Sequence, residues 1–148
     1  MKSLIRTFTI AGGLFLIAGI QNASAQVTDP VEFTTTFPFT VGDGTVPAGS
    51  YTIRPDDDNP AILELQGPAT TVFFEAQNKI PRETPNETEV VFKHYGDTYV
   101  LKDIWVAGSD TGAETLAAEG ERHAVKQYGS ATEERVQARK RAHTPTND

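Results

Sequence analysis

The chain has 148 residues, no cysteine, and a net charge of −7 that arises from 20 acidic and 13 basic residues. Without cysteine there can be no disulfide, no thiol nucleophile and no thiolate metal site. The acidic balance argues against nucleic acid and against an anionic membrane surface as partners.

Residues 1–25 have the pattern of a signal peptide. Lys2 and Arg6 are followed by an apolar run at residues 8–20, and the Ala-Ser-Ala triplet at 23–25 supplies the small residues of a cleavage site. The apolar run is shorter than the ~20 residues that span a bilayer. We expect cleavage after the triplet, no membrane anchor afterwards, and export to the periplasm or the medium.

The mature chain begins with an alternating pattern typical of β-strands. In VEFTTTFPFTV, residues 31–41, Phe and Val share one face while Thr and Glu share the other, which predicts a half-buried strand. Pro38 removes one ladder donor and therefore favours an edge position for this strand. GDGTVPAG, residues 42–49, predicts the turn of a hairpin, and residues 50–55 are its return strand.

Further strands are expected at residues 61–66 and 70–77, followed by a hairpin within residues 88–108. Gly96-Asp97 fits a two-residue turn of type I′ or II′, whose twist matches the flanking strands. Apolar side chains on both faces of this hairpin favour a central place in the sheet. The pattern predicts an all-β domain over residues 26–108, a small antiparallel β-sandwich or barrel of about six strands.

Residues 109–148 differ in composition and are expected to form a charged tail. Large apolar residues are scarce, and Ser130-Ala131-Thr132-Glu133 matches a helical capping box followed by basic residues at 139–141. This order predicts a partly formed, exposed helix with a disordered end.

The two hairpin sequences together resemble a family of small secreted bacterial proteins of unknown function. PFTVGDGTVPAGSYTI (residues 38–53) is similar to the family's PFxFxVG…LPAGxYxI hairpin, with Val46 in place of the frequent Leu. VFKHYGDTYVLKDIWVAG (residues 91–108) is similar to its later FxxYGxxYxLxxIWxxG hairpin. The resemblance covers most of residues 31–120. It implies export and an all-β fold, and it brings no catalytic residues.

Four aromatic residues are candidates for ligand binding: Tyr51, Tyr95, Tyr99 and Trp105. Exposed rings on a β-surface offer sugars and peptides contact area at little entropic cost. The alternative is that these rings pack in the core.

Asp56, Asp57 and Asp58 are candidate calcium ligands, because Ca²⁺ prefers several carboxylate oxygens. Pro55 and Pro60 enclose this acidic run, and the spaced ligands of an EF-hand are missing, so an ordinary solvated turn is the competing interpretation. No cofactor is predicted.

One short motif points toward catalysis. Asp110-Thr111-Gly112-Ala113 resembles the DTGA motif of aspartic proteases, in which two carboxylates share a proton. Gly108-Ser109 separates it from the preceding apolar strand, and no later apolar segment ends in the glycine that frames such a site. His94, His123 and His143 show no metal-binding spacing. We therefore expect no enzyme, and hold an aspartic-type hydrolase only as a remote alternative.

Two hypotheses for the function remain open. The first is an exported, non-enzymatic structural or interaction protein that acts by β-strand addition, with itself or with a cell-envelope protein. The second is a small module that binds carbohydrate, such as an envelope glycan, or another ligand through the four aromatic residues.

Overall fold

The computed structural model describes residues 27–141, and the predicted signal peptide and the end of the tail lie outside this range. Within this range, ten strands and one helix follow one another. They are β1 (Val31–Thr35), β2 (Phe39–Val41), β3 (Gly44–Val46), β4 (Gly49–Pro55), β5 (Ile62–Gln66), β6 (Thr71–Lys79), β7 (Glu89–Tyr95), β8 (Thr98–Trp105), β9 (Gly112–Thr115), α1 (Glu119–Tyr128) and β10 (Thr132–Lys140).

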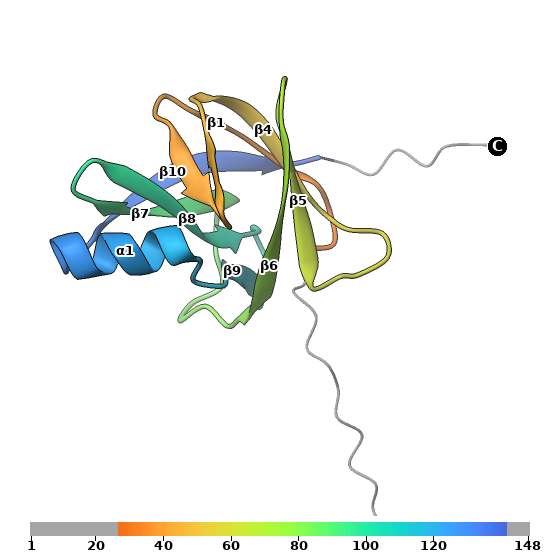
Figure 1. Ribbon diagram of the computed structural model, residues 1–148. Coiled ribbons are helices and arrows are strands. Elements are labelled where there is room, and N and C mark those ends of the chain that lie inside the picture. The colour runs from red at the N-terminus through yellow and green to blue at the C-terminus, as the bar shows by residue number, and fades with distance from the viewer. Residues whose placement is uncertain (1–26, 142–148) are drawn as a thin grey trace, which may run out of the picture.

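Eight of these strands close into an antiparallel barrel (Figure 1). The order around the barrel is β8-β7-β10-β1-β4-β5-β6-β9, and pairing of β9 with β8 completes the circle. The short β2–β3 hairpin is attached to β8 through a parallel contact between Thr40 and Val100. The expected all-β class and the barrel architecture are confirmed, although the strands outnumber the six that were predicted.

The predicted first hairpin is divided in two by the structure. Residues 36–38, which include Pro38, separate β1 from β2, so the long strand expected over 31–41 does not form. β2 pairs with β3, while β1 pairs with β4 along its whole length. β1 also pairs with β10, and its expected position at a sheet edge is therefore wrong.

The second hairpin agrees with its prediction. β7 and β8 are joined at Gly96-Asp97. The φ of Gly96 is 56°, whereas the φ of Asp97 is negative. This combination fits a type II′ turn, in which only the first central residue needs a left-handed backbone.

The predicted charged tail is part of the fold, and the domain does not end at Gly108. β9 pairs with both β6 and β8, and β10 lies between β7 and β1. The helix expected from Ser130 onward is instead strand β10, whereas a helix forms earlier, as α1. In β10, polar and charged side chains alternate with Val136 and Ala138, and this strand pattern outweighs the helical capping box at residues 130–133.

The core fills the barrel with side chains from nearly every strand. Phe33, Phe39, Tyr51 and Phe92 form a ring cluster in which neighbouring centroids lie 5.0–6.1 Å apart. Aliphatic residues such as Ile53, Leu63 and Leu65 continue it and are completely buried. The barrel interior is therefore a packed core, as is usual for eight-stranded barrels.

Candidate functional site

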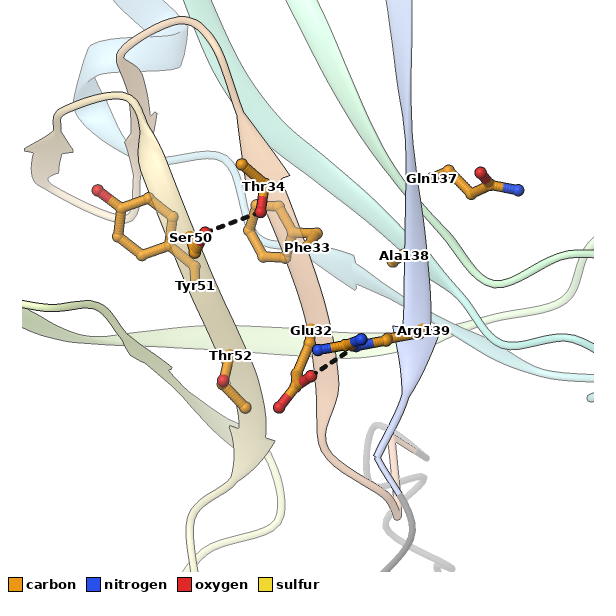
Figure 2. A pocket seen from close by; sticks show the side chains of 9 residues that line it. All are labelled: Glu32, Phe33, Thr34, Ser50, Tyr51, Thr52, Gln137, Ala138 and Arg139. Atoms are coloured by element: carbon orange, nitrogen blue, oxygen red, sulfur yellow. Dashed lines mark hydrogen bonds and ion pairs between the residues drawn. The ribbon is translucent and has the colours of Figure 1, made fainter.

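A surface cavity lies where β1 and β10 separate (Figure 2). Its volume is about 660 Å³, and its walls come from β1, β4 and β10. It is lined by Glu32, Phe33, Thr34, Ser50, Tyr51, Thr52, Gln137, Ala138 and Arg139. We call this cavity the fork.

The fork is polar, and its side chains already pair across the strands. Thr34 Oγ1 lies 2.8 Å from Ser50 Oγ, and Arg139 Nε donates to Glu32 Oε2 at 2.7 Å. The one carboxylate that lines the fork, Glu32, is paired with Arg139 and Arg141. The fork offers hydrogen-bond donors and acceptors, and its chemistry suits binding.

An open strand edge begins at the fork. β1 pairs with β10 only as far as Phe33 and Ala138, and Thr34 and Gln137, which would form the next pair of the ladder, are not paired. Beyond this point residues Thr132–Gln137 of β10 pair only with β7. Figure 2 shows the two ribbons diverging above Phe33 and Ala138.

The direction of the free main-chain groups follows from the hydrogen bonds at the end of β10. Ala138 N donates to Thr88 O on the β7 side, and Arg141 N donates to Pro30 O on the β1 side. Because successive residues of a strand direct their N–H and C=O groups to opposite sides, those of Glu133, Arg135 and Gln137 are directed away from β7. The Phe33–Ala138 pair of the ladder uses the C=O of Gln137, so three N–H groups and two C=O groups lack a ladder partner among the described strands.

The four aromatic residues predicted to bind ligand do not form an exposed platform. Tyr51, Tyr95 and Trp105 are buried, with exposed fractions of 3%, 7% and 8%. Tyr51 lies in the core cluster and its hydroxyl donates to Pro47 O at 2.5 Å, while burial raises its pKa. Burial also raises the pKa of Tyr95, as does the neighbouring Glu121 carboxylate, to which its hydroxyl donates at 3.4 Å.

Tyr99 is the one of the four that reaches the surface. It is half-buried and stacks between Phe37 and His94, with centroid separations of 3.9 Å and 4.0 Å. His94, which the sequence placed on a strand, thus contributes to a row of three stacked rings. Both faces of the Tyr99 ring are covered, so neither is free for a ligand.

The predicted calcium residues form a turn. Asp56 Oδ1 accepts hydrogen bonds from the main-chain N–H groups of Asp58 and Asn59, at 3.1 Å and 2.9 Å. Asp57 and Asp58 are exposed. Within residues 27–141, no three His, Asp or Glu side chains are arranged to hold a metal ion.

The DTGA motif lies at the start of β9. Asp110 is exposed in the turn before this strand, and Gly112 lies against the face of Trp105. A Cβ at position 112 would lie 2.7 Å from Ile104 O, which is closer than real Cβ contacts. The glycine in this motif is thus required by packing of the barrel wall.

A chain of ion pairs, which the sequence did not suggest, lies on the outside of the barrel. Lys79 Nζ contacts Asp103 at 2.8 Å and Glu114 at 3.2 Å, and Lys102 Nζ contacts Glu121 of α1 at 3.4 Å. These residues come from β6, β8, β9 and α1. The contacts hold α1 against the barrel, where Ala124 packs with Tyr95 and Val100.

Burial is the largest single influence on the pKa of Asp103, Lys79 and Glu114, but it sets the net direction only at Asp103. It raises the pKa of Asp103 by more than the Lys79 ammonium lowers it. For Lys79, burial lowers the pKa, but the hydrogen bonds and charges of Asp103 and Glu114 together outweigh it, and the net direction is upward. Burial would raise the pKa of Glu114, but the hydrogen bonds from Gln77 and Lys79 and the charges of Lys79 and Lys102 together outweigh it, and the pKa is lowered.

Comparison of the chain with protein-family models, with curated proteins and with solved structures finds no match. No helix within residues 27–141 is long and apolar enough to cross a membrane.

Proposed function

We propose that this is an exported, non-enzymatic interaction protein that accepts an extended segment of a cell-envelope protein along the open edge of β10. The observation that carries this proposal is that Thr132–Gln137 pairs with β7 alone. An added strand would find three free N–H and two free C=O groups there, and main-chain hydrogen bonds give this mode of recognition its affinity.

The fork supports the same function, because it leaves room for the incoming chain. It lies where the added strand would pass between β10 and the end of β1. Thr34, Ser50 and Gln137 line it with uncharged hydrogen-bonding groups, and these can contact the partner's main chain without requiring one sequence.

Charges on β10 favour a different protein as the partner over a second copy. Two copies could pair through their β10 edges around a two-fold axis, which places one residue opposite the same residue of the other copy. In the two registers with the most pairs, that residue is Glu134 or Arg135. Like charges directly opposite each other destabilise a strand pair. Charged side chains are also the usual protection of an edge against unspecific pairing. Glu134 is exposed and has no ion pair among the described residues, so we expect a basic residue opposite it.

The test compares two substitutions at one position of the full exported chain. Arg135→Pro removes the N–H that is directed to the open side, and Arg135→Ala keeps it. Both variants lose the ion pair of Arg135 with Glu89, so they differ in the main-chain donor and in the φ that proline fixes, and circular dichroism establishes that both fold. We expect a cell-envelope protein to be captured and cross-linked to residues 132–137 of the wild type and of Arg135→Ala, but not of Arg135→Pro.

Hydrogen exchange provides the second measurement. In the free protein the amides of Glu133, Arg135 and Gln137 should exchange quickly, while those of Glu134 and Val136 are protected by β7. Addition of the captured partner should slow the first group. Equal capture by both Arg135 variants, or bound partner without protection of these amides, would contradict strand addition.

A further inference from the structure

A second groove lies on the outside of the barrel, away from the fork. It has a volume of about 500 Å³ and is bounded by the β2–β3 turn, by β5 and β6, and by the segment that leads from β9 into α1. Phe73 and Leu116 line it, and their side chains are 57% and 42% exposed. Ile62 adds to this apolar floor. We call it the Phe73 groove.

Hydrogen bonds fix the walls of this groove. Leu116 N donates to Glu75 O at 3.1 Å, which holds the segment after β9 beside β6. Arg122 Nη1 donates to Ala117 O at 3.0 Å. Opposite, a Cβ at Gly42 would lie 3.4 Å from Phe74 Cβ, so the turn lies directly against β6. The exposed apolar side chains therefore lie between anchored walls.

The charges at the rim indicate the kind of molecule that the groove binds. Asp43, Glu75 and Glu119 line it and are exposed, and none has an ion pair or a side-chain hydrogen bond with another described residue. The one basic residue, Arg122, directs its guanidinium to a main-chain carbonyl. Three free carboxylates thus surround two exposed apolar side chains, and a second copy of the groove would meet them with like charges.

We propose that the Phe73 groove binds a basic, apolar peptide segment of a partner protein. Apolar side chains of that segment cover Phe73 and Leu116, and its Lys or Arg residues pair with Asp43, Glu75 and Glu119. Removal of the two apolar side chains from water supplies affinity. The carboxylates select for the basic residues and increase the association rate. This site is separate from the β10 edge, and it does not depend on the strand-addition proposal.

The probe is a fluorescein-labelled synthetic peptide of alternating Lys and Leu, measured by fluorescence anisotropy with the full exported chain. We expect saturable binding that weakens as salt is raised, because the pairs at the rim are exposed. Phe73→Ser and Leu116→Ser should each weaken binding about tenfold, which corresponds to a loss of about 1.4 kcal/mol. The matched control is Ile80→Ser, because Ile80 is 82% exposed but lies outside the groove.

A second pair of variants tests the carboxylates. Asp43→Asn combined with Glu119→Gln should weaken binding and reduce its salt dependence, whereas Asp57→Asn combined with Asp58→Asn removes two charges elsewhere and should change neither. Glu134→Lys on β10 should leave peptide binding nearly unchanged. Circular dichroism establishes that each variant folds.

Three outcomes would overturn the proposal. The first is an equal loss of binding in Ile80→Ser, which would mean general adhesion to exposed apolar residues. The second is equal binding of a peptide of alternating Glu and Leu, which would exclude selection by the carboxylates. The third is dimerisation in sedimentation that Phe73→Ser abolishes, which would assign the groove to a second copy of the chain.

Discussion

The ring of Phe39 shows how a residue of the short β2–β3 hairpin completes the barrel core. It is 1% exposed and lies 5.3 Å from the ring of Tyr51 and 5.0 Å from that of Phe92, measured between centroids. β2 forms only a short hairpin and a single parallel contact with the barrel. Side-chain packing, more than hydrogen bonding, therefore holds this hairpin in place.

We expect Phe39→Ala to lower the free energy of unfolding by about 3–5 kcal/mol, because it leaves a cavity among three rings. Phe73→Ala removes the same side chain from an exposed site and should change stability by less than about 1 kcal/mol. Urea unfolding followed by Trp105 fluorescence measures both. Similar losses in the two variants would contradict the burial of Phe39.

Gly112 and Gly120 make a matched pair with opposite expected effects. A Cβ at Gly112 would press against Trp105 and Ile104 O, and Gly112→Ala should cost about 1–3 kcal/mol. At Gly120, in α1, the nearest atom to a new Cβ is Thr40 Cγ2 at 3.6 Å. Gly120→Ala should therefore stabilise by about 0.5–1 kcal/mol through helix propensity. Melting temperatures that shift in the same direction in both variants would contradict this assignment.

At the scale of elements, β10 shows what local sequence could not indicate. Its sequence, TEERVQARK, has a helical charge order, and the structure makes it a strand because its outward side chains find partners far along the chain. Glu133 pairs with Lys93 at 2.7 Å, and Arg139 pairs with Glu32 at 2.7 Å. The sequence separation of such pairs hides them from any local pattern. By contrast, the β7–β8 hairpin was predictable because its turn and its apolar pattern are adjacent in the chain.

The candidate sites were less predictable than the strands, for a related reason. The sequence identified aromatic residues and acidic runs, but not their exposure. Tyr51 and Trp105 are buried by strands that pair around them, while Phe73, which alternation alone would assign to a strand face, lies exposed on the outside. The open edge of β10 can be located only from the pairing between β1 and β10, because it begins beyond the last pair, Phe33 and Ala138.

The ion pairs beneath α1 lead to a prediction with a defined pH dependence. Lys79→Met leaves the buried Asp103 carboxylate without its main partner, and we expect a loss of about 2–3 kcal/mol at neutral pH. The double variant Lys79→Met with Asp103→Leu should regain most of this loss, because no uncompensated charge remains. Chemical unfolding of the two variants measures the difference.

The direction of the pH effect follows from the raised pKa of Asp103. A carboxyl whose pKa in the folded state exceeds its ordinary value of 3.8 is increasingly protonated as the pH falls through that raised pKa, and its unfavourable burial is relieved. Glu114, whose pKa is lowered, stabilises the wild type above its ordinary 4.5 and loses this contribution as the pH falls through its lowered value. The deficit of Lys79→Met should therefore shrink between pH 7 and about pH 4. A deficit that grows on acidification would contradict the assignment.

At the scale of the whole molecule, the barrel depends on strands from both ends of the described chain. β10 lies between β7 and β1, and it connects the β1–β4–β5–β6 part of the wall to the β7–β8 hairpin. Without β10, both β1 and β7 would have unpaired edges and the core cluster around Phe33 and Phe92 would be open to water. Residues that look like a solvated tail thus close the fold.

Removal of residues 130–148 tests this dependence directly. We expect the shortened chain to lose its cooperative unfolding transition, because the three ladder pairs with β1, the six with β7 and the cover over the core disappear together. Removal of residues 142–148 alone leaves every described strand in place and should preserve the transition. Both chains are compared by circular dichroism during urea titration. If the chain that ends at residue 129 unfolded as cooperatively as the full one, β10 would not be a required part of the barrel. Its edge would then not be held in the fixed position that the proposed strand addition needs.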